Sequence, residues 1–280
     1  MAPQTPLLLI DNVFDTVGLY PGGTVDAISE VAGREAFRVA DYRRDRTYWQ
    51  PTSDGGGSDT WVRTQLLTAH AIDSILLDRG HNLTGKTVFL EGGPDGASWP
   101  TSISLTVPGA TTIGGTPAAP TMAQTEEGTA WTLFATTTAR LWWRLRVPYA
   151  AGFIPIVTGI IAGARTQLLG YSTTYDEDAG GRTQSTQMSS SGYLASDTTY
   201  SWRTAQLGLS YIGSTEYDGT IRTLRNLLFA RNQPTMLFMD YGTYPERGWL
   251  YQYDGTTWGM PKTRVYRSGP IPLRECGPRL

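Results

Sequence analysis

The sequence is poor in the residues from which many enzymes build their sites. Its 280 residues include one cysteine, Cys276, and two histidines, His70 and His81. One cysteine excludes an internal disulfide and a cysteine-based zinc site, and the spacing of the histidines fits no usual metal-ligand pattern. The sequence also lacks a Gly-x-Ser-x-Gly motif, a P-loop and a dinucleotide-binding glycine pattern. We therefore expect no catalytic residues, no metal site and no cofactor.

An excess of charge of either sign is also missing. The 23 lysines and arginines nearly balance the 25 aspartates and glutamates, so no overall field attracts nucleic acid or an anionic membrane. The longest apolar stretch, residues 153–164, is interrupted by Pro155 and Gly159 and is far shorter than the ~20 residues of a membrane span. The N-terminal residues lack the basic and apolar segments of a secretory signal. We expect neither nucleic-acid binding, nor membrane insertion, nor signal-directed secretion.

Short strands and turns are what the composition favours. The chain has 32 glycines and 17 prolines, many serines and threonines, and few long periodic apolar runs. This predicts an all-β or β-dominated protein, and the length suits two domains at ~150 residues each. A composition shift near residue 163 divides them into 1–163 and 164–280.

Residues 141–147 give the clearest strand signal. Leu141, Trp143, Leu145 and Val147 alternate with Trp142, Arg144 and Arg146, which is the period of a β-strand with one apolar face. We expect Trp143 and Leu145 inside a β-sandwich and the two arginines outside. Further strands are predicted at residues 75–77, 88–90, 103–107, 207–212 and 236–239, with a long loop at 108–120.

One helix is predicted in the second domain, near residues 219–231. Asp218 is expected to cap its N-terminus, and Ile221, Leu224 and Leu228 form a single apolar stripe. Such a helix should pack on a sheet.

A polar segment, residues 182–204, lies between the domain boundary and this helix. It is too polar for a core, yet it contains Tyr193, Tyr200 and Trp202. We expect an extended arm or β-hairpin that orders against a neighbouring subunit. The acidic triplet before it, residues 176–178, lacks the alternating spacing of a calcium loop and is interpreted as a solvated turn.

The nine tryptophans and fifteen tyrosines are the strongest positive signal. Trp49, Trp61 and Trp143 lie in or beside strand patterns, so we expect them in the core. Tyr48 and Trp99 lie in turn-rich segments, where aromatic rings can stack on sugars or anchor a protein interface.

The order of short motifs between residues 39 and 147 resembles the galactose-binding-like jelly roll of the discoidin and coagulation factor type C domains. The matching segments are Ala-Asp at 40–41, Thr-Tyr-Trp at 47–49, Trp-Val at 61–62, Asn-Leu-Thr-Gly at 82–85, the turn at 93–99 and the closing strand at 139–146. The family's frequent terminal cysteine pair is missing here, which folding in a reducing compartment would explain.

The resemblance implies a jelly-roll β-sandwich with any ligand site on loops at one end. If this domain binds sugar, we expect the site at the loop end that carries Arg43, Arg46 and Tyr48, together with Asp95 and Trp99. Aromatic rings would stack on the sugar while charged groups bond its hydroxyls.

The second domain is similar to siphophage tail proteins in its polar β-arm, followed by strand, short helix and strand. A phage also explains how a protein without a secretion signal works outside the cell. The leading hypothesis is a structural component of a bacteriophage tail tip or baseplate, located in the virion. Its expected partners are further copies of itself, neighbouring tail proteins and a host-surface glycan. A stand-alone carbohydrate-binding protein is the second hypothesis, and a glycan-active enzyme with paired carboxylates is the third.

Overall fold

The computed structural model describes residues 6–41, 47–109, 112–168, 180–188, 194–208, 217–255 and 271–276, of which 180–188 and 194–202 are described by their backbone alone. The chain forms two compact units. Unit 1 consists of Met1–Gln167 and Met236–Gly248, and unit 2 consists of Leu168–Thr235 and Trp249–Leu280. The sequence predicts one boundary near residue 163, whereas the segment Met236–Gly248 returns to the unit formed by the N-terminal part of the chain.

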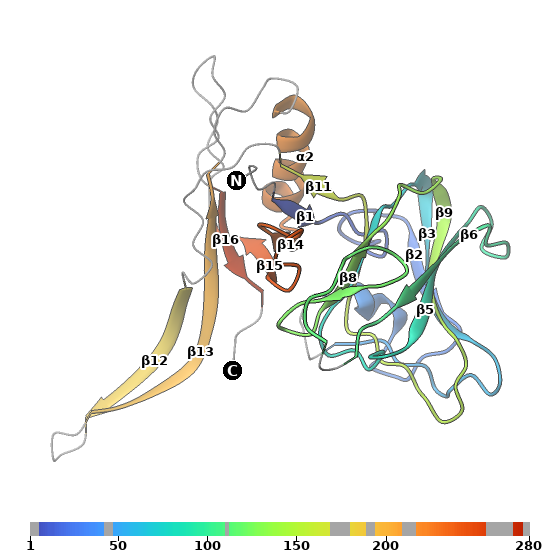
Figure 1. Cartoon of the computed structure of the whole chain (residues 1–280), viewed down its shortest axis with the longest axis horizontal. Helices are drawn as coiled ribbons and strands as arrows, with labels where there is room; N and C mark the ends of the chain where they lie inside the picture. The colour runs from blue at the N-terminus through green and yellow to red at the C-terminus, as the bar shows by residue number, and fades with distance from the viewer. Residues whose placement is uncertain are drawn as a thin grey trace. The chain divides into compact units, whose positions relative to one another are not determined.

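Unit 1 contains two antiparallel sheets that face each other as a β-sandwich (Figure 1). Five strands follow the order β2-β3-β9-β5-β6, and four follow the order β10-β4-β8-β7. The strands of the first sheet are β2 (Thr24–Ala27), β3 (Thr60–His70), β9 (Arg140–Val147), β5 (Thr87–Gly93) and β6 (Thr101–Thr106). Those of the second are β10 (Ile160–Gly163), β4 (Ser74–Leu77), β8 (Ala130–Leu133) and β7 (Ala123–Gln124). A 3-10 turn, η1 (Ala36–Ala40), lies between β2 and β3.

The core of the sandwich follows from the alternation along its strands. In β9, Trp143 and Leu145 are fully buried, while Arg144 and Arg146 lie on the outer face, as expected. Inward side chains of both sheets join them in one apolar cluster, which includes Val62, Leu66, Ile75, Leu77, Val88, Leu90, Leu105, Val147 and Ile160. The predictions of a β-dominated fold and a jelly-roll β-sandwich are confirmed.

The prediction that Trp61 lies in the core is wrong. It alternates with buried Val62 and Thr64 in β3 and is only half-buried on the outer face. Trp49 is fully buried as expected, with its indole N–H donating to the carbonyl of Ser29 at 3.2 Å.

Residues 236–248 contact the rest of unit 1 through strand pairing and ring contacts. Strand β14 (Thr235–Phe238) pairs antiparallel with β1 (Leu7–Leu9), which also pairs with β11 (Thr166–Gln167). The ring of Phe238 lies 4.0 Å from that of buried Trp131, whose indole N–H donates to the carbonyl of Pro245 at 3.0 Å. These long-range contacts explain why residues 236–248 belong to unit 1.

In unit 2, four strands pair in the order β15-β16-β13-β12. Its strands are β15 (Gly248–Tyr253), β16 (Ile271–Glu275), β13 (Leu194–Leu207) and β12 (Gly180–Met188). Strands β12 and β13 form an antiparallel hairpin, visible in Figure 1 as a long ribbon. The hairpin predicted for residues 182–204 is thus confirmed, while its ordering against a neighbour stays a prediction.

One continuous helical segment runs through η2 (Tyr217–Ile221), α2 (Arg222–Arg225) and η3 (Asn226–Ala230), with π-type winding at both ends. The apolar stripe of Ile221, Leu224 and Leu228 is buried as predicted. The helix begins at Tyr217, so Asp218 lies in its first turn rather than at the cap. Among the described residues, no helix is long and apolar enough to cross a membrane.

Candidate functional site

The structure describes three of the five expected site residues, Tyr48, Asp95 and Trp99. Arg43 and Arg46 lie outside the described residues, as does the acidic triplet 176–178. The ring of Tyr48 is covered by the guanidinium of Arg34, at 3.6 Å from the ring centre. Asp95 and Trp99 belong instead to the connection between β5 and β6. Within the described residues, no hydrogen bond or ring contact joins Tyr48 to Asp95 or Trp99.

Asp95 shapes the turn that carries Trp99. Its Oδ1 accepts the backbone N–H groups of Ala97 and Ser98, at 3.0 and 2.8 Å. These two hydrogen bonds lower the pKa of Asp95. Gly96 holds a positive φ of 71°, and a side chain at this position would meet the ring of Trp142. The turn is therefore fixed by its own residues, and Asp95 positions Trp99.

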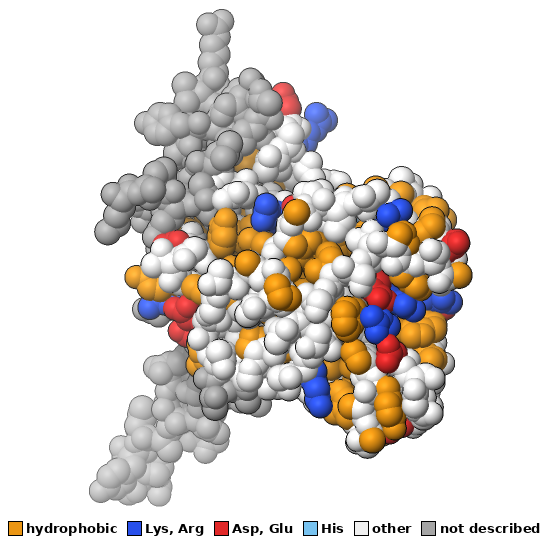
Figure 2. Space-filling model, turned by 45° about the vertical axis from the view of Figure 1, so that its right-hand side comes forward, with side chains coloured by type: hydrophobic (Ala, Val, Ile, Leu, Met, Phe, Trp, Pro, Cys, Tyr) orange, Lys and Arg blue, Asp and Glu red, His pale blue; other side chains and the backbone are white. Residues whose placement is uncertain are grey.

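Trp99 belongs to a larger surface on the outer face of the five-stranded sheet, which we call the aromatic–arginine face. Its rings are Trp61, Phe89, Trp99 and Trp142, and its guanidiniums are Arg63, Arg144 and Arg146. Each ring centre lies 4.1–4.9 Å from a guanidinium carbon. Figure 2 shows hydrophobic side chains beside basic and acidic ones on the surface of unit 1.

Glu91 of β5 holds this face together. Its carboxylate accepts Nε of Arg144 at 2.6 Å and Nη2 of Arg146 at 2.9 Å, and its side chain is only 7% exposed. Burial raises the pKa of Glu91, but the hydrogen bonds from Arg146 and Arg144 outweigh it and leave the pKa below its usual value. Glu91 is therefore an anion at neutral pH, fixed between two cations.

Two exposed acidic residues complete the pairing. Asp26 of β2 accepts Nε and Nη2 of Arg63 at 2.8 and 2.9 Å, and Asp59 accepts Nη1 of Arg146. The hydrogen bond and charge of Glu91 raise the pKa of Arg146. Cation–π contacts and ion pairs thus order the side chains of this face, which stays partly open to solvent.

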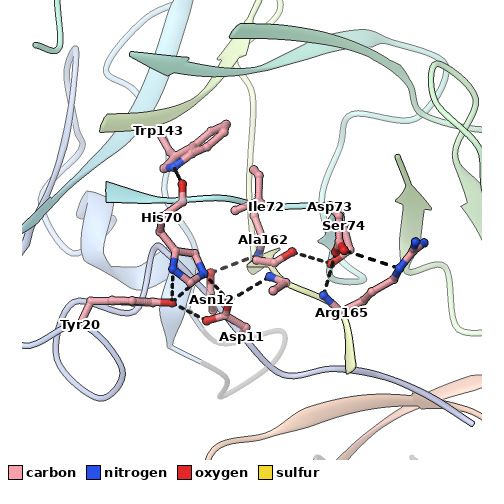
Figure 3. Close-up of polar contacts among 12 residues, drawn as sticks. Asp11, Asn12, Tyr20, His70, Ile72, Asp73, Ser74, Trp143, Ala162 and Arg165 are labelled. Carbon is pink, nitrogen blue, oxygen red and sulfur yellow. Dashed lines mark hydrogen bonds and ion pairs between the residues drawn. The ribbon is translucent and has the colours of Figure 1, made fainter. Parts of the chain in front are cut away.

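A second polar cluster lies where β3 ends, at His70 (Figure 3). His70 Nε2 lies 2.6 Å from Asp11 Oδ2, and the Tyr20 hydroxyl donates to Asp11 Oδ1 at 2.6 Å. Asp11 also accepts the backbone N–H of Ala164. Burial raises the pKa of Asp11, but the bonds from His70 and Tyr20 hold it below its usual value.

The chemistry of this second cluster is mainly structural. An aspartate that orients a histidine is one part of a nucleophilic site, but such a site also needs a nucleophile within reach of the other ring nitrogen. Both ring nitrogens of His70 lie near the Tyr20 hydroxyl, at 3.0 and 3.3 Å, and that hydroxyl is already bonded to Asp11. The indole of Trp143 also donates to the carbonyl of His70 at 3.2 Å. The cluster ties the N-terminal segment to β3.

A metal site is not supported by the described residues, where no three histidine, cysteine, aspartate or glutamate side chains are grouped to hold an ion. The aromatic–arginine face is therefore the stronger candidate site. The alternation of Trp142, Arg144 and Arg146 indicates this face in the sequence, whereas nothing in the local sequence indicates the pairing with Glu91.

No protein-family model matches the sequence, and no curated protein matches it. Similar solved structures include a fucosidase of Ruminococcus gnavus in complex with fucose, at 15% identity and a TM-score of 0.39, with 55% of this chain and 27% of the fucosidase covered. This chain thus matches about a quarter of that enzyme.

Two smaller solved structures are similar over about half of this chain. One is chitosan-binding module 1 from a Paenibacillus chitosanase/glucanase, at 12% identity and a TM-score of 0.36, covering 55% of this chain and 98% of the module. The other is a family 32 carbohydrate-binding module of Clostridium perfringens in complex with galactose, at 12% identity and a TM-score of 0.35, covering 50% and 92%. The fold class of unit 1 rests on its own strand pairing.

Proposed function

We propose that this chain is a binding and assembly protein rather than an enzyme, and that it is a structural component of a bacteriophage tail tip or baseplate. Several identical copies would contact one another and neighbouring tail proteins in the virion. The observation that carries this proposal is the β12–β13 ribbon of unit 2. Symmetric repetition is the usual way in which such contacts are closed.

Most of the ribbon pairs only with itself among the described residues of unit 2. Strand β13 pairs with β16 only over Thr204–Leu207, whereas in the described residues its preceding part pairs with β12 alone. A two-stranded ribbon is marginally stable by itself in water. Its sequence is also rich in Ser, Thr and Gln, a composition that offers few apolar side chains for a core. Contact with a neighbouring subunit would supply the missing stabilisation.

Deleting the gene in the producing phage tests the structural role. We expect intact heads with tails that are unfinished or unable to adsorb, and infectious particles with complete tails would refute the proposal. A sharper variant replaces residues 182–200 by a short Gly-Ser linker, which keeps the pairing of Thr204–Leu207 with β16. This variant should fold but fail to enter particles, whereas a Leu67→Ser control at a 73% exposed position should enter them normally.

A second proposed activity is contact between unit 1 and a host-surface glycan, and the Trp99–Arg144 pair is the observation that favours it. A half-buried indole beside a charged donor offers the two groups that sugars commonly meet in proteins. Glycan-array binding of the Trp99→Ala and Tyr48→Ala variants tests its location. Loss in Trp99→Ala alone places the contact on the aromatic–arginine face, and loss in Tyr48→Ala alone places it at the loop end. Unchanged binding in both variants would remove both sites.

A further inference from the structure

The arginines of the aromatic–arginine face use their N–H groups differently. Arg63 donates to Asp26 through Nε and Nη2 and to the carbonyl of Gly96 through Nη1. Arg146 likewise uses Nε, Nη1 and Nη2, for Glu91 and Asp59. Arg144 donates only through Nε, to Glu91 at 2.6 Å. Its two terminal amines have no protein partner in the described part of the chain.

Arg144 is nevertheless held in place. Glu91 fixes its Nε, and the indole of Trp99 lies 4.1 Å from its guanidinium carbon. The side chain remains 18% exposed, so its terminal edge is open to solvent. A planar guanidinium edge binds a carboxylate through two parallel hydrogen bonds. Since the side chain is already ordered, little conformational entropy is lost when a ligand binds.

The terminal amines of Arg144 favour an acidic ligand over a neutral one. Arg140 lies on the other side of the sheet, beside Gly92 and Trp143, where it donates through Nε to Thr101 at 3.1 Å. The three arginines of the outer face are matched by three carboxylates, so the terminal amines of Arg144, rather than an excess of positive charge, select an anion. Each ring of the face has a guanidinium over it, so a ligand that reaches a ring also meets a positive charge. A carboxylate at Arg144 gains a charge-assisted bidentate contact that a neutral sugar lacks.

The neighbouring edge strand favours a glycan over a protein segment. Strand β6 exposes the hydroxyls of Ser102, Ser104 and Thr106, and Ser102 pairs with Glu91 in the next strand. A row of exposed hydroxyls suits the hydroxyls of a sugar chain, whereas the centre of a protein interface is usually apolar. We infer that the aromatic–arginine face binds a carboxylate-bearing glycan, with the terminal edge of Arg144 on the carboxylate. This inference rests on the proposed glycan contact of unit 1.

Calorimetric titration of the full chain tests the inference with two matched probes. One is a tetramer of 1,4-linked mannuronic acid, and the other is its neutral methyl ester. We expect the acid to bind at least about tenfold more tightly than the ester. Arg144→Gln should abolish this preference, and Arg144→Lys should keep only part of it, because an ammonium is a point charge without the bidentate edge.

The matched control is Arg38→Gln. Arg38 is also an arginine of unit 1 that lies over a ring, that of Phe37, and bonds a glutamate, Glu35. The Arg38→Gln variant removes the same charge from another part of unit 1 and should leave the preference for the acid over the ester intact. The ratio of acid to ester affinity stays interpretable if a variant is partly unfolded, since both affinities fall together.

Three outcomes would overturn the inference, and they differ in what else they affect. An unchanged preference in Arg144→Gln would leave glycan binding intact but move it to another site. Failure of both probes and of the glycan array would remove the proposed glycan contact itself. Arg144-dependent binding of a tetra-aspartate peptide, with none of the uronate, would assign the site to a protein carboxylate.

Discussion

The two faces of the five-stranded sheet are built by the same strands but held by different forces. Along β9, Trp143 and Leu145 are fully buried against the opposite sheet. Their neighbours Trp142 and Arg144 are half-buried on the outer face, where rings and ion pairs alternate. The period of a β-strand thus places packing on one side and polar, partly exposed chemistry on the other.

The inner face therefore contributes most of the free energy of unfolding, whereas the outer face is the one that a ligand can reach. Apolar burial on the inner face is non-directional and contributes ~25 cal/mol per Å² removed from water. Ion pairs on the outer face contribute less, because solvent screens them and long side chains lose entropy. Glu91 is the exception, since it is almost as buried as the core. The outer face therefore can bind a ligand at little cost to the fold.

Replacing Trp143 by Ala should have the largest effect. The ring is fully buried and its indole N–H donates to the carbonyl of His70, so the variant leaves a large cavity and an unpaired acceptor. We expect a loss of ~3–5 kcal/mol in the free energy of unfolding, measured by urea denaturation. A loss below ~1 kcal/mol would mean that Trp143 does not pack on the inner face.

Glu91→Gln should have the next largest effect. It leaves Arg144 and Arg146 without their buried anion, and we expect a loss of about 2 kcal/mol at pH 7. Because the pKa of Glu91 lies below its usual value of 4.5, its stabilisation is present above that pH and is lost as pH falls through the folded-state pKa.

The control for Glu91→Gln is the dependence of the free energy of unfolding on pH below 4.5. The difference between the wild-type protein and Glu91→Gln should shrink as the pH falls below 4.5, because protonation removes the same charge. A difference that stays constant from pH 7 to the acid limb would show that packing, rather than ionisation, accounts for the loss.

Trp61→Ala compares the same residue type across the two faces. Trp61 is half-buried, and its ring centre lies 4.6 Å from the guanidinium carbon of Arg63. We expect a loss of ~1 kcal/mol from partial burial and the cation–π contact. If Trp61→Ala costs as much as Trp143→Ala in the same urea experiment, the outer face is part of the core in energetic terms.

Much of the fold can be predicted where one face of an element is apolar and the other polar. This holds for β9 and for the stripe of Ile221, Leu224 and Leu228 in the helix. The prediction fails for Trp61, since β3 carries apolar residues on both faces and its sequence does not show which face is buried. It also fails for residues 236–248, whose place depends on pairing with β1, more than two hundred positions away.

The candidate site was less predictable, because its contacts cross the sheet. Arg146 and Glu91 are 55 positions apart and meet only through the register of β5 with β9. Asp95 and Trp99 share one turn whose hydrogen bonds are local, but the guanidinium over Trp99 comes from strand β9. A local pattern can show that Arg144 points outward, yet only the side-chain contacts show that its terminal amines have no partner among the described residues.

Asp26→Asn should have the smallest effect and sets the lower end of the comparison. Asp26 accepts two N–H groups of Arg63, but its side chain is 49% exposed, so solvent screens the pair. We expect a loss of about 0.5 kcal/mol in the free energy of unfolding at low salt, falling toward zero in 1 M NaCl. The Trp143→Ala loss should not show this salt dependence, since it comes from packing. If Asp26→Asn instead costs as much as Glu91→Gln and resists salt, the outer face is stabilised as one ion-pair network rather than by Glu91 alone.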